Sequence, residues 1–106
     1  NHVALYVGGM GAKGRNFYNT LFTRYGYVDE AASIQDLYLH GKKAEAAAAV
    51  PDGFVRSIAL IGPIGHVEQR VEAYRSAGVS CLIAEPLAPS HADRVEHVAA
   101  LKEHTG

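Results

Sequence analysis

The residues with the clearest chemical potential lie in a glycine-rich run, Gly8-Gly9-Met10-Gly11-Ala12-Lys13-Gly14-Arg15. Glycines leave backbone N–H groups accessible. Lys13 and Arg15 add positive charge just before an expected helix, whose N-terminus carries a positive partial charge. The run lacks the Gly-Lys-Ser/Thr ending of a phosphate loop, and it does not match the G-x-G-x-x-G pattern. The run therefore predicts one of two structures. One is a loop in which Gly11, Lys13 and Arg15 contact a bound anion, and the other is a flexible turn between helices.

Two further candidates lie in the second half of the chain. Gly62-Pro63-Ile64-Gly65 precedes an expected helix N-terminus, where Gly62 and Gly65 could admit an anion or could merely make a compact turn. Glu85 follows an apolar run and could orient a substrate or accept a proton. It could equally be a solvated residue before Pro86.

Other chemistries find little support in the sequence. The six histidines form neither an H-E-x-x-H motif nor a close acidic cluster, so no metal site is expected. The net charge of -1 argues against binding nucleic acid or an anionic membrane. No apolar stretch approaches the roughly 20 residues that cross a bilayer. The single cysteine, Cys81, cannot form an internal disulfide, which favours a cytoplasmic protein, and its apolar neighbours predict a buried, inert thiol.

The elements that must position these residues are helical in the first half. Asn16 has the character of an N-cap, and apolar residues recur at helical spacing from Phe17 to Tyr25. Further helices are expected from Asp29 to Gly41 and from Lys42 to Val50. Pro51 is able to open the next helix.

The second half alternates between helix and apolar run. Phe54–Ile61 fits either a helix or a short strand, as does Val3–Val7 in the first half of the chain. Val67 to Ala77 has one apolar face and should be a helix. Val79–Ala84 is continuously apolar, as a strand buried on both faces would be. A final helix follows, and its start at Ser90 resembles a capping box.

Several of these landmarks together resemble one known family. The stretch Ala4–Asn19, which reads ALYVGGMGAKGRNFYN, is similar to the luciferase-like monooxygenase superfamily and closest to its coenzyme F-420-dependent branch. Ile34–Leu39, Ala46–Asp52, Leu60–Pro63 and Ala77–Val79 resemble the same branch in the same order. The likeness extends through about residue 84.

The resemblance implies an α/β fold, namely the C-terminal fragment of a (β/α)8 TIM barrel. Residues 1–53 would be inserted helices, and residues 54–106 the last helix-strand-helix. Such a fragment would be mostly helical with one to three short strands. A barrel needs eight strands and about 250 residues, so the chain could not close one alone. Because the sequence starts abruptly inside an apolar segment, we expect it to be cut from a larger protein.

The resemblance also implies a function. The parent protein would transfer a hydride between coenzyme F-420, or alternatively FMN, and a small organic substrate, with this fragment alone inactive. Gly11, Lys13, Arg15, Gly62 and Gly65 would border the cofactor, and Glu85 the substrate. No catalytic residue is carried over. Two alternatives are a non-catalytic fragment that forms homo-oligomers through the Ser80–Ala84 edge, and a small anion-binding α/β module.

Overall fold

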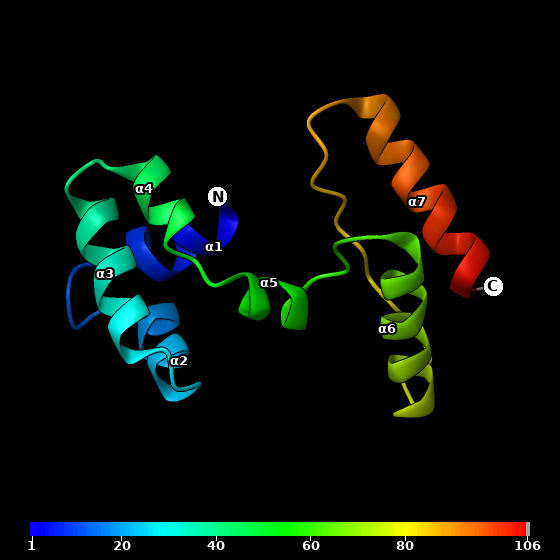
Figure 1. The fold of residues 1–106 in the computed structure, drawn as a ribbon, viewed down its shortest axis with the longest axis horizontal. Helices are drawn as coiled ribbons and strands as arrows, with labels where there is room; N and C mark the ends of the chain where they lie inside the picture. The colour runs from blue at the N-terminus through cyan, green and yellow to red at the C-terminus, as the bar shows by residue number, and fades with distance from the viewer. Residues whose placement is uncertain (106) are drawn as a thin grey trace. The chain divides into compact units, whose positions relative to one another are not determined.

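The computed structural model describes residues 1–105, which fall into two compact units, each taken by itself below (Figure 1). The N-terminal unit, Asn1–Ala59, contains α1 (His2–Ala4), the π-helix η1 (Leu5–Gly9), α2 (Phe17–Arg24), α3 (Val28–Leu39), α4 (Lys43–Ala48) and α5 (Asp52–Ile58). The C-terminal unit, which begins at Leu60, contains α6 (Ile64–Ser76) and α7 (His91–Thr105).

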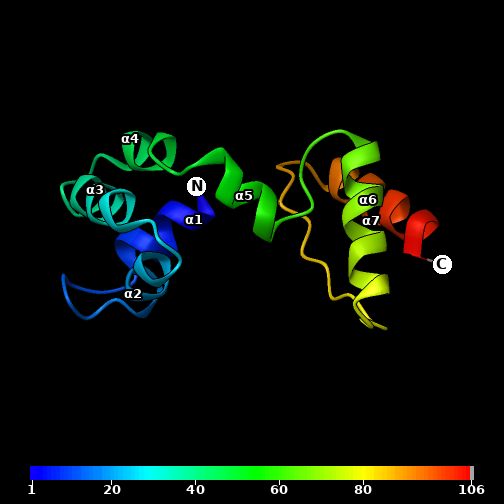
Figure 2. The same cartoon turned by 60° about the horizontal axis from the view of Figure 1, so that its bottom comes forward.

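The N-terminal unit is organised around α3, which packs against η1, α2 and α4 (Figure 2). Ala31 and Ile34 of α3 are buried in the core, and Leu37 and Tyr38 pack against it while remaining partly exposed. The alanine-rich α4 has strong helix propensity but little side chain to bury, so it must approach its neighbours closely. Ala46 does so and has no exposed surface.

An aromatic cluster forms the second part of this core. The rings of Phe22 and Tyr27 stack with centroids 4.8 Å apart, and Phe54 packs edge-on against Phe22 at 4.6 Å. Edge-to-face and offset-stacked rings are the favoured aromatic geometries. Phe22 is almost completely buried, while its helix neighbour Phe17 is 69% exposed.

The glycines of η1 allow that helix to lie directly against α3. A Cβ atom built on Gly8 would come within 2.6 Å of the Tyr38 Cβ atom and 3.0 Å of the Ile34 carbonyl oxygen. A Cβ atom on Gly9 would come within 2.4 Å of the Tyr38 ring. These two glycines, which the sequence pattern placed in an anion-binding loop or a flexible turn, therefore lie inside a helix and permit its close packing.

The C-terminal unit is more loosely packed. Within its described residues 60–105, Val71 is the one buried side chain. Polar contacts join α6 to α7: the Arg75 guanidinium donates to the His104 carbonyl oxygen at 3.1 Å, and His104 Nδ1 lies 3.2 Å from a Glu68 carboxylate oxygen. The Ser90 hydroxyl accepts from the Asp93 backbone N–H at 3.0 Å, which confirms the predicted cap of the last helix.

The predicted α/β fold is wrong for this structure, because residues 1–105 contain helices and no strand. Val3–Val7 lies in α1 and η1, and most of Phe54–Ile61 lies in α5. Val79–Ala84 is neither helix nor strand. A strand is stable only when a neighbour pairs with its backbone N–H and C=O groups. No neighbour of this kind exists among the described residues, and no piece of a barrel sheet is seen.

The same absence of a neighbour corrects the expectation for Cys81. Its thiol is exposed, because the apolar run around it is not covered. None of the helices within residues 1–105 combines the length and apolar character that crossing a membrane requires.

Candidate functional site

The glycine-rich candidate is a tight loop that joins η1 to α2. Gly11 has a φ of 147°, and a Cβ atom placed there would lie 2.8 Å from the Arg15 carbonyl oxygen. The loop closes further through the Arg15 N–H, which donates to the Ala12 carbonyl oxygen at 2.9 Å. The structure thus brings Gly11 and Arg15 into direct contact, with Lys13 at the outer edge of the turn.

Lys13 is not available as a simple anion receptor. Its ammonium group donates to the carboxylate of Asp36 on α3, and the two exposed side chains form an ion pair. The hydrogen bond from Lys13, together with its positive charge, holds the pKa of Asp36 below its ordinary value of 3.8. His40 Nδ1 lies 2.7 Å from the Asp36 backbone oxygen, one turn further along the chain.

Arg15 is the cationic side chain of the loop that remains accessible to a ligand. Its side chain is exposed and makes no ion pair with any described residue. It stands next to α2, where the backbone N–H groups of Phe17 and Tyr18 are unused within the described structure. A guanidinium group beside two N–H donors can contact an anionic group such as a phosphate or carboxylate.

Two asparagines hold this loop against the helices. Asn16 is 2% exposed, and its amide donates to the carbonyl oxygens of Tyr6 at 2.9 Å and Val7 at 3.1 Å. Its side-chain oxygen accepts from the Asn19 N–H at 3.1 Å, which confirms the predicted N-cap. The Asn19 amide donates to Val7 at 3.1 Å and to Ala31 at 2.8 Å.

Sequence reasoning missed two of these positioning residues. The Asn19 amide donates to carbonyl oxygens of η1 and α3, and no local pattern predicts these distant partners. Asp36 is 23 residues from Lys13, and no local pattern could have paired them. The loop is therefore fixed by residues that lie outside the glycine-rich run itself.

The remaining candidates lie in the C-terminal unit. Gly62 precedes α6 with a φ of 115°, and Gly65 lies in the first turn of α6, where a Cβ atom would meet nothing within 4 Å. Glu85 is exposed in the segment between α6 and α7. The structure does not group these three residues around a cavity, and their roles as cofactor and substrate contacts stay predictions.

An open groove of about 600 Å³ lies within the C-terminal unit. Its walls come from α6, α7 and the segment between them and expose similar amounts of polar and apolar surface; the larger apolar lining residues are Val71, Tyr74, Val79, Leu82, Val98 and Leu101. Arg75 and Lys102 add positive charge to it. Glu85 does not line this groove.

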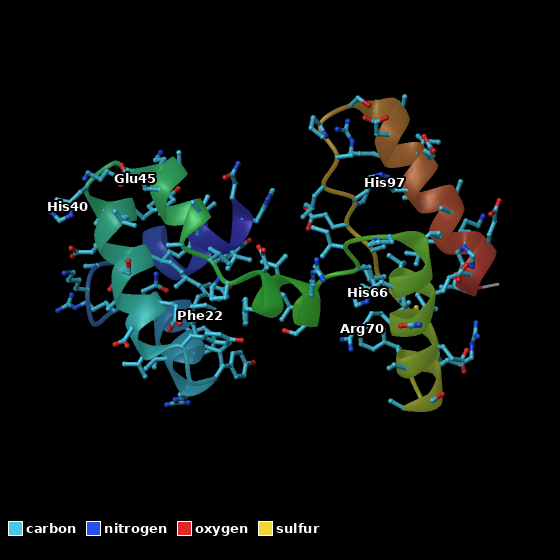
Figure 3. The ribbon with its side chains drawn as sticks, viewed as in Figure 1. Phe22, His40, Glu45, His66, Arg70 and His97 are labelled. Atoms are coloured by element: carbon cyan, nitrogen blue, oxygen red, sulfur yellow. The ribbon has the colours of Figure 1, made fainter. Side chains whose placement is uncertain are left out.

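No metal centre is evident in the described part of the chain. Residues 1–105 hold no group of three histidine, cysteine, aspartate or glutamate side chains placed to share an ion. The histidines labelled in Figure 3 come from separate elements: His40 follows α3, His66 lies on α6 and His97 on α7.

The comparisons with known proteins identify the family. The profile of the luciferase-like monooxygenase family matches residues 1–81. A Mycobacterium tuberculosis protein, provisionally named a coenzyme F-420-dependent oxidoreductase, is 34% identical over 99 residues. That match covers 93% of this chain and 28% of the relative, so the chain spans less than a third of the relative's length. No solved structure matches the chain. The chain belongs to the luciferase-like monooxygenase family.

Proposed function

We propose that this chain is part of an oxidoreductase that uses coenzyme F-420 and transfers a hydride to or from a small organic substrate. The observation that carries the proposal is the match of most of the chain to the luciferase-like monooxygenases, together with its similarity to a relative named for coenzyme F-420. FMN is the alternative cofactor. The cofactor would supply the hydride chemistry, and the protein would hold and orient it.

The N-terminal unit would contribute one contact to the binding of the cofactor or substrate. Arg15 and the first N–H groups of α2 would contact an anionic group of the cofactor or substrate. Gly11 shapes the turn that presents Arg15. Lys13 forms an ion pair with Asp36, so we assign Lys13 no direct contact with the anionic group.

The described residues fit the charged part of such a cofactor and not its ring. The Gly11–Arg15 loop lines neither of the two concavities described for residues 1–105, and a planar ring system needs a largely apolar pocket that buries it. We therefore assign this chain an anion contact and derive no step of the reaction through its residues.

Titration of the full chain with coenzyme F-420 and with FMN tests the proposal. We expect weak binding of coenzyme F-420, seen in its absorbance and fluorescence, and a loss of about tenfold in affinity for Arg15→Ala, since a charge-assisted hydrogen bond contributes about 1.5–3 kcal/mol. Arg24→Ala, an exposed arginine at the end of the same helix, is the matched control. If neither cofactor bound, or if both variants behaved alike, the proposed contact would be refuted.

A further inference from the structure

The ion pair between Lys13 and Asp36 joins the glycine-rich loop to α3. The two side chains are 66% and 53% exposed, and the lysine ammonium donates to the carboxylate. An ion pair in contact with water contributes little free energy, because ordering two long side chains offsets most of the attraction. A dissolved anion can therefore compete with Asp36 for the ammonium group of Lys13.

The backbone of α3 is fixed on one side of this contact, while the lysine side chain on the other side is flexible. Asp36 follows the buried residues Ile34 and Gln35, and its carbonyl oxygen accepts from the His40 N–H at 3.2 Å. The aliphatic stem of a lysine rotates readily. A change of partner at Lys13 thus requires side-chain rotation and no movement of a helix.

Lys13 and Arg15 belong to the same tight turn. Gly14 stands between them with a φ of 76°, and the Arg15 N–H donates to the Ala12 carbonyl oxygen at 2.9 Å. A Cβ atom on Gly14 would meet nothing within 4 Å, so no other part of the described chain covers the turn between the two cations. Two cations on one exposed turn can share a single oxyanion through charge-assisted hydrogen bonds.

We propose that the carboxylate of Asp36 is a built-in competitor of the anion site. It occupies Lys13 in the free chain, and an arriving anion must displace it before Lys13 and Arg15 hold that anion together. This inference rests on the proposed anion contact at Arg15. It gives Asp36 an autoinhibitory role, so removing the charge of Asp36 should strengthen anion binding.

The competitor is charged at neutral pH. The hydrogen bond and the charge of Lys13, and to a smaller extent the charge of His40, lower the pKa of Asp36 below its ordinary value of 3.8. The Asp36 carboxylate is therefore ionised under the conditions in which a phosphate or sulfate group would bind, and the competition does not depend on an acidic solution.

Titration of the full chain with inorganic sulfate tests the proposal, with the backbone amide signals of Phe17 and Tyr18 followed by NMR. Asp36→Asn should raise the affinity for sulfate about three- to tenfold, because it frees Lys13 to donate to the anion. Asp29→Asn is the matched control, since Asp29 is an exposed carboxylate on the same helix. It should change the affinity by less than about twofold.

Lys13 supplies a readout that a general change of charge would not reproduce. Saturating sulfate should shift the side-chain signals of Lys13 in Asp36→Asn. In the background of Lys13→Met, the gain from Asp36→Asn should fall to the size of the Asp29→Asn effect, because no ammonium group is released. A gain of full size in that background would overturn the competitor role of Asp36.

The remaining outcomes separate this inference from the anion contact on which it rests. Equal sulfate affinities of the wild-type chain and Asp36→Asn, together with weaker binding by Arg15→Ala, would refute the competitor role and leave the contact at Arg15 intact. No response to sulfate in any variant would refute both. Circular dichroism of each variant separates lost binding from lost folding.

Discussion

The side-chain amide of Asn16 donates a hydrogen bond to the carbonyl oxygen of Val7 at 3.1 Å, and this contact ties the start of α2 to the end of η1. The last carbonyl groups of a helix have no partner within that helix. Asn16 supplies one for Val7 and another for Tyr6, while its oxygen caps α2. One buried side chain therefore completes the ends of two helices.

Replacing Asn16 should be costly. Asn16→Ala should lower the free energy of unfolding by about 2–3 kcal/mol, because it removes an N-cap together with the hydrogen bonds from the amide to the Tyr6 and Val7 carbonyl oxygens. Asn16→Asp should also destabilise, since its carboxylate would face two carbonyl oxygens. Urea denaturation followed by circular dichroism measures both variants against Ser33→Ala, an exposed position on α3. A loss as small as that of the control would contradict this role for Asn16.

Two helical glycines, Gly8 in η1 and Gly53 in α5, give stability predictions of opposite sign. Gly8→Ala should destabilise the N-terminal unit by about 1–3 kcal/mol, because its methyl group would overlap Tyr38 in a packed core. Gly53→Ala should stabilise by about 0.5–1 kcal/mol, since Gly53 lies in α5 with open space around it. Thermal melts of the two variants make the comparison. Equal shifts of the melting temperature would show that η1 and α3 are not in close contact.

The ion pair between Lys13 and Asp36 should be visible in a titration. Because the pKa of Asp36 is lowered in the folded chain, the pair stabilises the fold above the ordinary carboxyl value of 3.8 and loses this effect as pH falls through the lowered pKa. Lys13→Met should return the pKa of Asp36 toward 3.8. Carbon NMR of the side-chain carboxyl groups follows this, with Lys43→Met as the control. An unchanged Asp36 titration in Lys13→Met would exclude the pair in solution.

The buried amide of Gln35 offers a stabilising substitution. Gln35 is 5% exposed, and its Nε2 atom has no hydrogen-bond partner among the described residues. An unsatisfied buried donor costs about 1–3 kcal/mol, so Gln35→Met, which keeps the shape, should raise the unfolding free energy by about 1 kcal/mol. Gln69→Met on the exposed face of α6 should change it by less than about 0.5 kcal/mol. A destabilised Gln35→Met variant would mean that the amide is used in the folded protein.

Local signals in the sequence predicted the helices well. Asn16 and Ser90 cap the helices that their residue types indicated, and the family resemblance is confirmed over residues 1–81. Local signals failed where the outcome depends on a distant partner. Val79–Ala84 has the composition of a buried strand, yet the described chain offers it no second strand.

The candidate site shows the same division. Composition and spacing predicted a loop at Gly11, Lys13 and Arg15, and the structure has a tight turn there. Asp36, which is distant in sequence, forms an ion pair with Lys13 and not with Arg15. Pairing over such a distance follows from how η1 and α2 pack on α3, and no local pattern encodes it.

Because α6 and α7 bury so few side chains, they should unfold differently from the N-terminal unit. Cooperative unfolding requires a shared core, and within residues 60–105 that core is Val71 alone. Amide hydrogens in α6 and α7 should therefore exchange with solvent orders of magnitude faster than those of α3, and the helical signal should disappear in two steps on heating. The second half of this sequence is thus a pair of helices whose lifetime, in the isolated chain, is set by local fluctuation rather than by global unfolding.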